Sequence, residues 1–208
     1  MFAKRSVELL LLLVLSTIPT LALAHASGNA TIPTSGQFSE SETAAMLQEI
    51  NVLANAQISV RDAIEIAEKR TPGAKAVDVS FDGRADRLAY RVKTYWQNEV
   101  WEGTVDASTG KIVGEGIVTP VSTLDAIDRI ELADFRTAGI DLSDVVPIAE
   151  KYGEGKAVSA GLEEEDGRLI FLVVVVVDGA LKQLSVDPNE EQSRAQTSLG
   201  GKRKPSSK

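Results

Sequence analysis

The residues best suited to chemistry in this chain are its acidic side chains, because it has no cysteine and a single histidine, His25. Four consecutive acids, Glu163 to Asp166, could offer carboxylate oxygens to Ca²⁺. Their spacing is not that of an EF-hand loop, and Gly167 follows directly, which favours a hairpin turn or a solvated strand end. Paired carboxylates could also hydrolyse a glycoside, but a glycosidase needs a cleft lined by aromatic and polar residues. Aromatic residues make up only 5% of the chain. We therefore expect no catalytic residue, no metal ligand and no cofactor.

The first 26 residues have the layout of a secretory signal peptide. Lys4 and Arg5 precede an apolar run from Leu9 to Leu15, and small residues follow as far as Ala26. A basic region, an apolar region and a small-residue cleavage site in this order are typical of export. We expect cleavage after Ala24 or Ala26 and a periplasmic or secreted location. The alternative is an uncleaved segment that anchors the chain to the membrane.

Cleavage after Ala26 would also remove the one histidine. Thiol nucleophiles, disulfides, zinc held by Cys or His, and Ser-His-Asp triads would then be excluded. Removing Lys4, Arg5 and Glu8 from the 22 basic and 30 acidic residues leaves 20 and 29, a net charge of −9. Because affinity for nucleic acid depends on basic contacts to phosphate, we expect no nucleic-acid partner.

Two parts of the chain repeat one another. Ile-Ala-Glu-Lys occurs at 66–69 and again at 148–151, an offset of 82. Residues 86–90 then correspond to 167–171, and Val-Asp at 105–106 to Val-Asp at 186–187, both at an offset of 81. An offset that stays constant except for one deletion in a loop is typical of a duplication.

Each copy reads as a helix followed by antiparallel strands. Ser59 and Asp62 predict a capped helix start in the first copy, and Thr71-Pro72-Gly73 predicts its end. In the second copy the start is predicted at Asp141, and Pro147 predicts a helix that is short or begins late. Alternating apolar and polar residues predict strands, with hairpin turns at Gln97-Asn98 and Asp178-Gly179.

A further amphipathic helix is predicted before each copy, at 39–56 and at 121–138. Residues 27–38 and 191–208 are predicted to be disordered, the latter as a basic tail. The fold class is therefore α+β, with two tandem small domains, 39–117 and 118–190. In each domain we expect helices packed on a three-stranded antiparallel sheet.

The first copy resembles the PepSY domain. The resemblance rests on Ser59, the helix Ala63-Ile64-Glu65-Ile66-Ala67, Pro72-Gly73, Tyr90-Arg91-Val92 and the run from Val105 to Lys111. The second copy is degenerate, because it lacks Pro-Gly and has Pro188-Asn189-Glu190 after Val186-Asp187. The family occurs in propeptides of thermolysin-like metalloproteases and in exported bacterial proteins. The resemblance implies a bacterial envelope location, a role in modulating peptidases and no catalytic residues.

The two copies differ on the outward face of the middle strand. The first copy has polar and aromatic residues there, and the second has only apolar ones: Arg91, Lys93, Tyr95 against Ile170, Leu172, Val174, Val176. Because a solvated sheet face is not apolar, something must cover the second set. The candidates are the helix at 121–138, the first copy, a second chain or another partner. Arg and Tyr anchor many interfaces, so these seven residues are the predicted protein-interaction surface. An ordinary solvated strand face is the alternative for the first set.

We therefore expect an exported, non-enzymatic protein-binding module that modulates or inhibits a peptidase. This chain shows no protease motif, so such an action would be in trans. The alternative is a structural envelope module, or one that senses a small molecule or cation, acting through self-association as a homodimer. Membrane contact is expected only if the signal segment is not cleaved.

Overall fold

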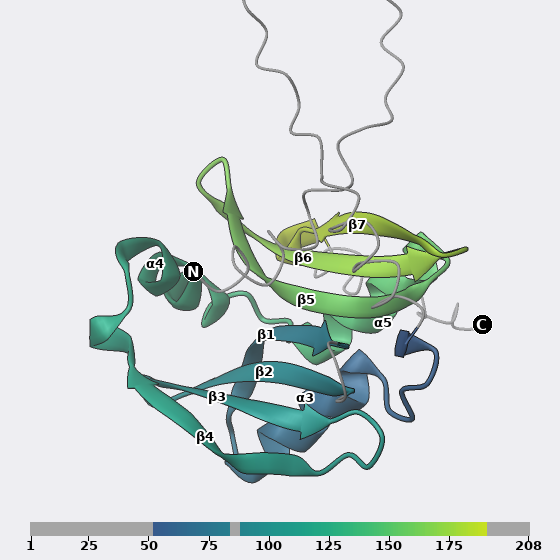
Figure 1. Cartoon of the computed structure of the whole chain (residues 1–208). Helices are drawn as coiled ribbons and strands as arrows, with labels where there is room; N and C mark the ends of the chain where they lie inside the picture. Colours follow the sequence, from purple (N-terminus) through teal and green to yellow (C-terminus); the bar gives the residue numbers. More distant parts are fainter. Residues whose placement is uncertain (1–51, 84–87, 191–208) are drawn as a thin grey trace, which may run out of the picture.

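The structure, a computed structural model, describes residues 52–83 and 88–190 (Figure 1). Its elements are, in chain order, α3 (Val60–Arg70), β1 (Lys75–Asp82), β2 (Ala89–Trp96), β3 (Glu99–Asp106), β4 (Ile112–Pro120), the 3₁₀ turn η2 (Val121–Thr123), α4 (Ala126–Phe135), α5 (Leu142–Gly153), β5 (Lys156–Glu165), β6 (Arg168–Val177) and β7 (Ala180–Val186). The predicted signal segment, both predicted disordered segments and most of the helix expected at 39–56 lie outside the described residues. Within the described ranges, no helix has both the length and the hydropathy to cross a bilayer.

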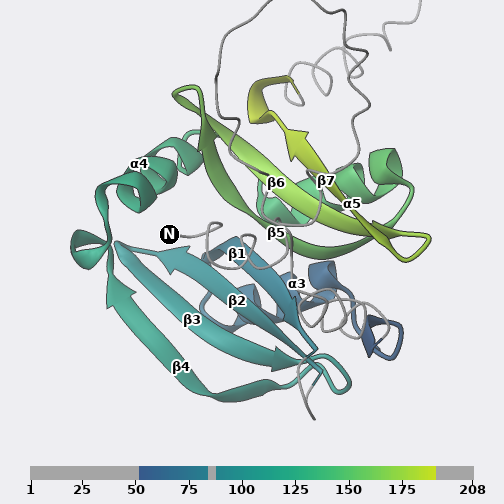
Figure 2. The same ribbon diagram turned by 45° about the horizontal axis from the view of Figure 1, so that its top comes forward.

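The seven strands of the described residues form one antiparallel sheet in the order β4-β3-β2-β1-β5-β6-β7 (Figures 1 and 2). β1 and β5 join the two parts of the sheet, with Val79 opposite Ala160 at the centre of their pairing. The α+β fold class is confirmed. The expectation of separate three-stranded sheets is wrong, because β1 and β5 would each expose an unpaired edge and instead satisfy each other's backbone groups.

The strand β4 was not expected from the sequence. Gly114 and Gly116 interrupt its apolar residues and have φ of 73° and 75°, so the run lacks the alternation that predicts a strand. β4 nevertheless pairs with β3 over most of its length, with a register shift between Glu102 and Thr104. The first copy therefore contributes four strands, and the boundary predicted at residue 117 falls inside β4.

Both predicted helix starts are found. The Ser59 hydroxyl accepts a hydrogen bond from the Asp62 N–H at 3.1 Å, and the Asp62 carboxylate accepts one from the Ser59 N–H at 2.8 Å. α5 begins after its N-cap Asp141 and runs for 12 residues with Pro147 inside it, so the expectation of a short or late helix is wrong. Tertiary packing outweighs local propensity here, because α5 buries an apolar stripe of Leu142, Val145, Val146 and Ala149.

The helix predicted at 121–138 is divided. Residues Val121–Thr123 form the 3₁₀ turn, and α4 begins after Asp125, whose carboxylate accepts a hydrogen bond from the Asp128 N–H at 2.9 Å. The chain needs this break in order to leave the edge of the sheet at β4 and reach α5 beside β5 and β6, as Figure 1 shows.

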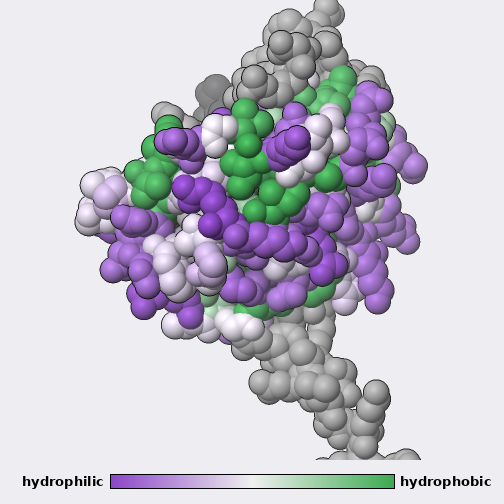
Figure 3. All heavy atoms as spheres, turned by 90° about the horizontal axis from the view of Figure 1, so that it is seen from below, coloured by the Kyte–Doolittle hydropathy of each residue, from purple (hydrophilic) through white to green (hydrophobic). Residues whose placement is uncertain are grey.

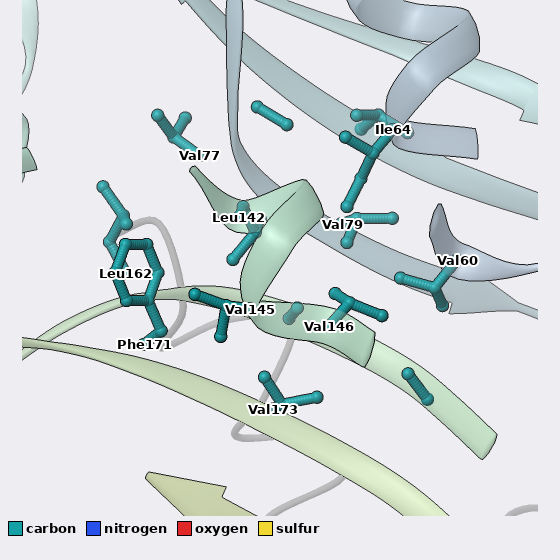
Figure 4. Packing of buried hydrophobic residues seen from close by; sticks show 14 of the residues in the cluster. Val60, Ile64, Val77, Val79, Leu142, Val145, Val146, Leu162, Phe171 and Val173 are labelled. Carbon is teal, nitrogen blue, oxygen red and sulfur yellow. The ribbon is translucent and has the colours of Figure 1, made fainter. Parts of the chain in front are cut away.

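One hydrophobic core serves both copies. α3 and α5 contact each other along one face of the sheet (Figures 1 and 2). Figure 4 shows side chains from α3, α5, β1, β5 and β6 pointing toward one another, including Ile64, Val79, Leu142 and Phe171. The predicted inward faces of β2 and β6 are confirmed, since Tyr90 and Phe171 are 1% and 0% exposed. Because the core crosses the boundary between the copies, each copy completes the other's packing.

The first half of the described chain (residues 52–120) and the second half (121–190) share hydrogen bonds at equivalent places. The Glu68 carboxylate accepts from the Ala76 N–H at 2.8 Å, and the Glu150 carboxylate accepts from the Ala157 N–H at 2.9 Å. β1 has a register shift directly after Ala76, and β5 has one directly after Ala157.

The turns that lead into α3 and α5 also match. The Ala56 N–H donates to the Leu53 carbonyl, and the Ala138 N–H donates to the Phe135 carbonyl. Equivalent residues in the helices and their turns are 82 positions apart, and equivalent residues in the strands are 81 apart. These are the two offsets of the sequence repeat. Val79 lies opposite Ala160, the residue 81 positions later, and an antiparallel pairing centred on equivalent residues has local twofold symmetry. We infer that an approximate twofold axis passes between β1 and β5.

Candidate functional site

The first-half residues of the predicted interaction surface lie on the outward face of β2. Arg91 is exposed, and its Nε lies 4.0 Å from an oxygen of Asp82. The Nζ of Lys93 lies 4.0 Å from an oxygen of Glu102 on β3. Tyr95, half-buried, places its hydroxyl 3.5 Å from the Asn98 side chain. The structure thus brings two cations and a phenol together along one strand.

The second-half residues of that surface are mostly buried. Leu172 and Val174 are 1% and 2% exposed, and with Val158 they form a second hydrophobic cluster against which Leu53 packs. Ile170 is 8% exposed and Val176 is half-buried. The helix at 121–138, one expected cover for this face, is not that cover: the Phe135 ring of α4 packs on Phe171, which belongs to the core on the opposite face, with 6.2 Å between centroids.

Polar residues of β1 and β5 separate the two parts of the predicted surface. Asp78 lies opposite Lys93 on β2 and opposite Gly161 on β5, and Ser80 lies opposite Ser159. Oxygens of Asp78, Ser80 and Ser159 are buried without a hydrogen-bond partner among the described residues. Burial raises the pKa of Asp78 to about 7, and the positive charge of Lys93 opposes this rise. The centre of this face therefore holds a carboxyl group that titrates near neutral pH.

The run Glu163 to Asp166 forms the end of β5 and its turn into β6. Asp166 and Gly167 have φ of 52° and 74°, the left-handed conformations of a tight hairpin. Glu164 accepts a hydrogen bond from the Gly167 N–H at 2.7 Å. The hairpin-turn interpretation is confirmed. In the part of the chain that the structure describes, no three His, Cys, Asp or Glu side chains group as metal ligands.

A cavity of about 390 Å³ lies between the two halves. Leu53, Ile58 and Tyr90 of the first half contribute its apolar walls, while Ser59 and Asp62 lie at the start of α3. The Tyr90 hydroxyl donates a hydrogen bond to the Ile58 carbonyl at 3.0 Å, and burial raises the pKa of Tyr90. This phenol therefore stays neutral in the cavity wall.

The charged groups of the cavity come from both halves. The pKa of Asp62 is lowered chiefly by its hydrogen bond from the Ser59 N–H, so Asp62 is a carboxylate near neutral pH. The cavity is also lined by two charged residues of the second half, Glu150 and Lys156. Sequence reasoning did not single out Glu150 or Lys156 as functional residues. Glu150 belongs to the repeated Ile-Ala-Glu-Lys, which indicated only a duplication, and Lys156 belongs to no motif. Only the alignment of the two copies could have indicated them.

Exposed apolar residues on the edge strand β4 were also missed. Ile117 and Val118 are 68% and 49% exposed, and β4 ends the sheet. Seen from below, the molecule is largely hydrophilic, with its hydrophobic residues in separate patches (Figure 3). The left-handed glycines of β4 twist this edge, which is how natural sheets limit pairing with other strands.

Comparison with protein families assigns the first half. Residues 57–115 match the family model described as "Peptidase propeptide and YPEB domain", and the chain carries a PepSY domain over these residues. In the structure they run from the turn before α3 into β4. The predicted resemblance of the first copy is thereby confirmed, and with it the association with a domain of peptidase propeptides.

No curated protein matches the chain. Among solved structures, it is similar to a crystal structure described as a putative lipoprotein from Clostridium difficile 630. The identity is 20%, the match covers 64% of this chain and 88% of the other, and the TM-score is 0.38.

Proposed function

We propose that this chain is an exported, non-enzymatic protein-binding module that modulates a peptidase in trans. The observation that carries the proposal is the PepSY domain at 57–115, a domain of peptidase propeptides. The sequence pattern of residues 1–26 supports export, since it places a basic and an apolar region before small residues.

Arg91, Lys93 and Tyr95 support a contact surface on β2. Arg and Tyr are enriched among the residues that dominate binding energy in protein interfaces. The ion pairs of Arg91 and Lys93 are each 4.0 Å long and partly exposed, and such pairs contribute little to stability. These cations could therefore exchange their present partners for carboxylates of a bound protein at small cost, so we propose a partner surface that is acidic and apolar.

The test is an inhibition assay with a purified thermolysin-like metallopeptidase and a peptide substrate. We expect increasing amounts of the chain to slow hydrolysis in a saturable way. The triple variant R91A/K93A/Y95A should need at least ten times more protein for the same effect. The double variant I127A/Y152A, at residues 59% and 58% exposed on α4 and α5, is the matched control and should act as the wild type does. An unchanged hydrolysis rate, or a triple variant as potent as the wild type, would contradict the proposal.

A second candidate, an envelope module that senses a small molecule, is favoured by the cavity between the halves. When its ligand binds, such a module would change how strongly it associates with other copies of itself. Sedimentation velocity with and without a cavity ligand tests this: a change in sedimentation coefficient supports sensing through self-association, and identical profiles count against it.

A further inference from the structure

The contact between the two halves has two equivalent ends, and one of them is closed. At this closed end the Lys75 ammonium donates a hydrogen bond to the carboxylate of Asp141, the N-cap of α5. This hydrogen bond is the main cause of the raised pKa of Lys75. Glu68 and Asp144 also lie close enough to act on Lys75. One lysine is therefore surrounded by three carboxylates, and its partner Asp141 comes from the other half.

The other end is the cavity. The residues equivalent to Lys75, Glu68 and Asp144 are Lys156, Glu150 and Asp62, at the same offsets of 81 and 82. The residue equivalent to Asp141 is Ser59, which is likewise the N-cap of its helix. All four line the cavity. Because serine replaces aspartate, the carboxylate partner of the lysine is missing at this end, and Lys156 forms no ion pair within the described residues.

The apolar residues at the two ends also differ, and at one position the cavity end again has the smaller side chain. At the closed end, Phe135 is 6% exposed and packs edge-on against Phe171. The equivalent residues at the cavity are Leu53 and Tyr90, at offsets of 82 and 81. Leucine is shorter than phenylalanine, and the Tyr90 hydroxyl is held by the Ile58 carbonyl. The cavity end therefore has room for an apolar group and for a carboxylate. At the closed end, the chain itself supplies both.

We propose that the cavity binds a monocarboxylate with a short apolar chain. Its carboxylate pairs with Lys156 as Asp141 pairs with Lys75, and its apolar chain lies against Leu53 and Ile58. With this ligand the cavity would hold one lysine and three carboxylates, the same set of charges that the closed end already holds. A free organic acid and the C-terminus of a peptide share this chemistry. The proposal goes beyond peptidase modulation and does not depend on it.

Hexanoate is the probe, and hexanamide is its uncharged control. In ¹H–¹⁵N NMR titrations of the purified chain we expect hexanoate to cause saturable shifts concentrated at the amides of Ser59, Asp62, Tyr90 and Lys156. Hexanamide should bind at least ten times more weakly, because it cannot form the ion pair. A short peptide with an apolar C-terminal residue, compared with its C-terminal amide, then distinguishes a peptide terminus from a free acid as the natural source.

Two variants test the assignment by opposite changes. Lys156→Met removes the cation at an exposed position, so we expect the variant to fold, and dispersed NMR spectra verify this. Ser59→Asp rebuilds the carboxylate of the closed end, where Asp141 is likewise the N-cap of its helix and pairs with Lys75. Both should weaken hexanoate binding at least tenfold. Lys75→Met, the matched change at the closed end, should leave hexanoate binding unchanged. The proposal is overturned if hexanoate shifts none of these amides, or if the wild type, Lys156→Met and Ser59→Asp bind it equally.

Discussion

At the scale of single residues, Asp78 is a buried carboxyl group whose ionisation opposes folding. Burial raises its pKa from an ordinary 3.8 to about 7. Between these pH values the folded chain keeps a proton that the unfolded chain has lost, so this group makes the free energy of unfolding fall as pH rises from about 4 to about 7. Asp78→Asn removes the titration and keeps the shape. We expect the variant to be more stable than the wild type at pH 8 and little different at pH 4.

Urea unfolding at both pH values measures this difference. Asp82→Asn is the control, because Asp82 lies on the same strand but is only half-buried, and its effect should be small at either pH. The account of Asp78 would be wrong if Asp78→Asn were less stable than the wild type at pH 8, since Asp78 would then be ionised and favourable.

Asp62 affects the pH dependence of stability in the opposite direction to Asp78. Its pKa is lowered, chiefly by the hydrogen bond from the Ser59 N–H, so the stability it contributes is present above pH 3.8 and is lost as pH falls through its folded pKa. We expect Asp62→Ala to cost about 1 kcal/mol at pH 7, the usual size of a capping interaction. Urea unfolding should show this gap narrowing at acidic pH. A gap independent of pH would mean that the carboxylate charge has no part in the cap.

At the scale of elements, β3 and β4 are held to α3 by one flat ring. Trp101 is 4% exposed, its Nε1 donates to the Glu115 carbonyl at 2.8 Å, and Arg70 lies 4.7 Å above the ring centroid. A Cβ at Gly103 would lie 2.0 Å from the ring. Gly103→Ala should therefore cost about 1–3 kcal/mol, as overpacking does.

A double-mutant cycle in urea checks this cause. In the background of Trp101→Leu the ring is gone, so adding Gly103→Ala should cost clearly less than it does in the wild type. Equal costs in the two backgrounds would show that the ring is not what makes glycine necessary at this position.

The outward face of β6 gives a second prediction at this scale. Leu172 and Val174 are 1% and 2% exposed, so the double variant L172K/V174K would bury charges without partners. We expect a loss of about 3 kcal/mol or more in the free energy of unfolding. Arg91→Leu, at the equivalent position of the first half, is the matched control and should change stability by no more than about 0.5 kcal/mol. A lysine variant as stable as the wild type would mean that this face is solvated.

At the scale of the whole molecule, local features could be predicted from the sequence and the joining of the copies could not. The cap at Ser59, the hairpin turns and the inward Tyr90 and Phe171 each depend on a few neighbouring residues. The pairing of β1 with β5 joins residues about 80 positions apart in the sequence, and no alternation pattern says which edges meet. Pro147 led to the wrong prediction of a short or late helix, because its local cost is outweighed by the core that α5 shares with the first half. The cavity could not be predicted for the same reason, since Ser59 and Lys156 come together only where the two halves touch.

The shared core leads to a prediction about cooperativity. Both tryptophans, Trp96 and Trp101, lie in the first half, so their fluorescence reports that half, whereas far-UV ellipticity reports both. If one core and one sheet hold the molecule, the two signals should give the same urea midpoint. Leu142 is 0% exposed in α5, in the second half. Leu142→Ala should cost about 2–5 kcal/mol and lower the fluorescence midpoint as much as the ellipticity midpoint.

Tyr152→Ala is the matched control, because this residue of α5 is 58% exposed and should leave both midpoints nearly unchanged. A fluorescence midpoint that stays at the wild-type value in Leu142→Ala, while the ellipticity midpoint falls, would show that the halves unfold separately. The continuous sheet would then be a weak docking of two independent units. Coincident shifts would instead mean that the two halves unfold as one unit, so a ligand bound in the cavity between them must stabilise both halves together.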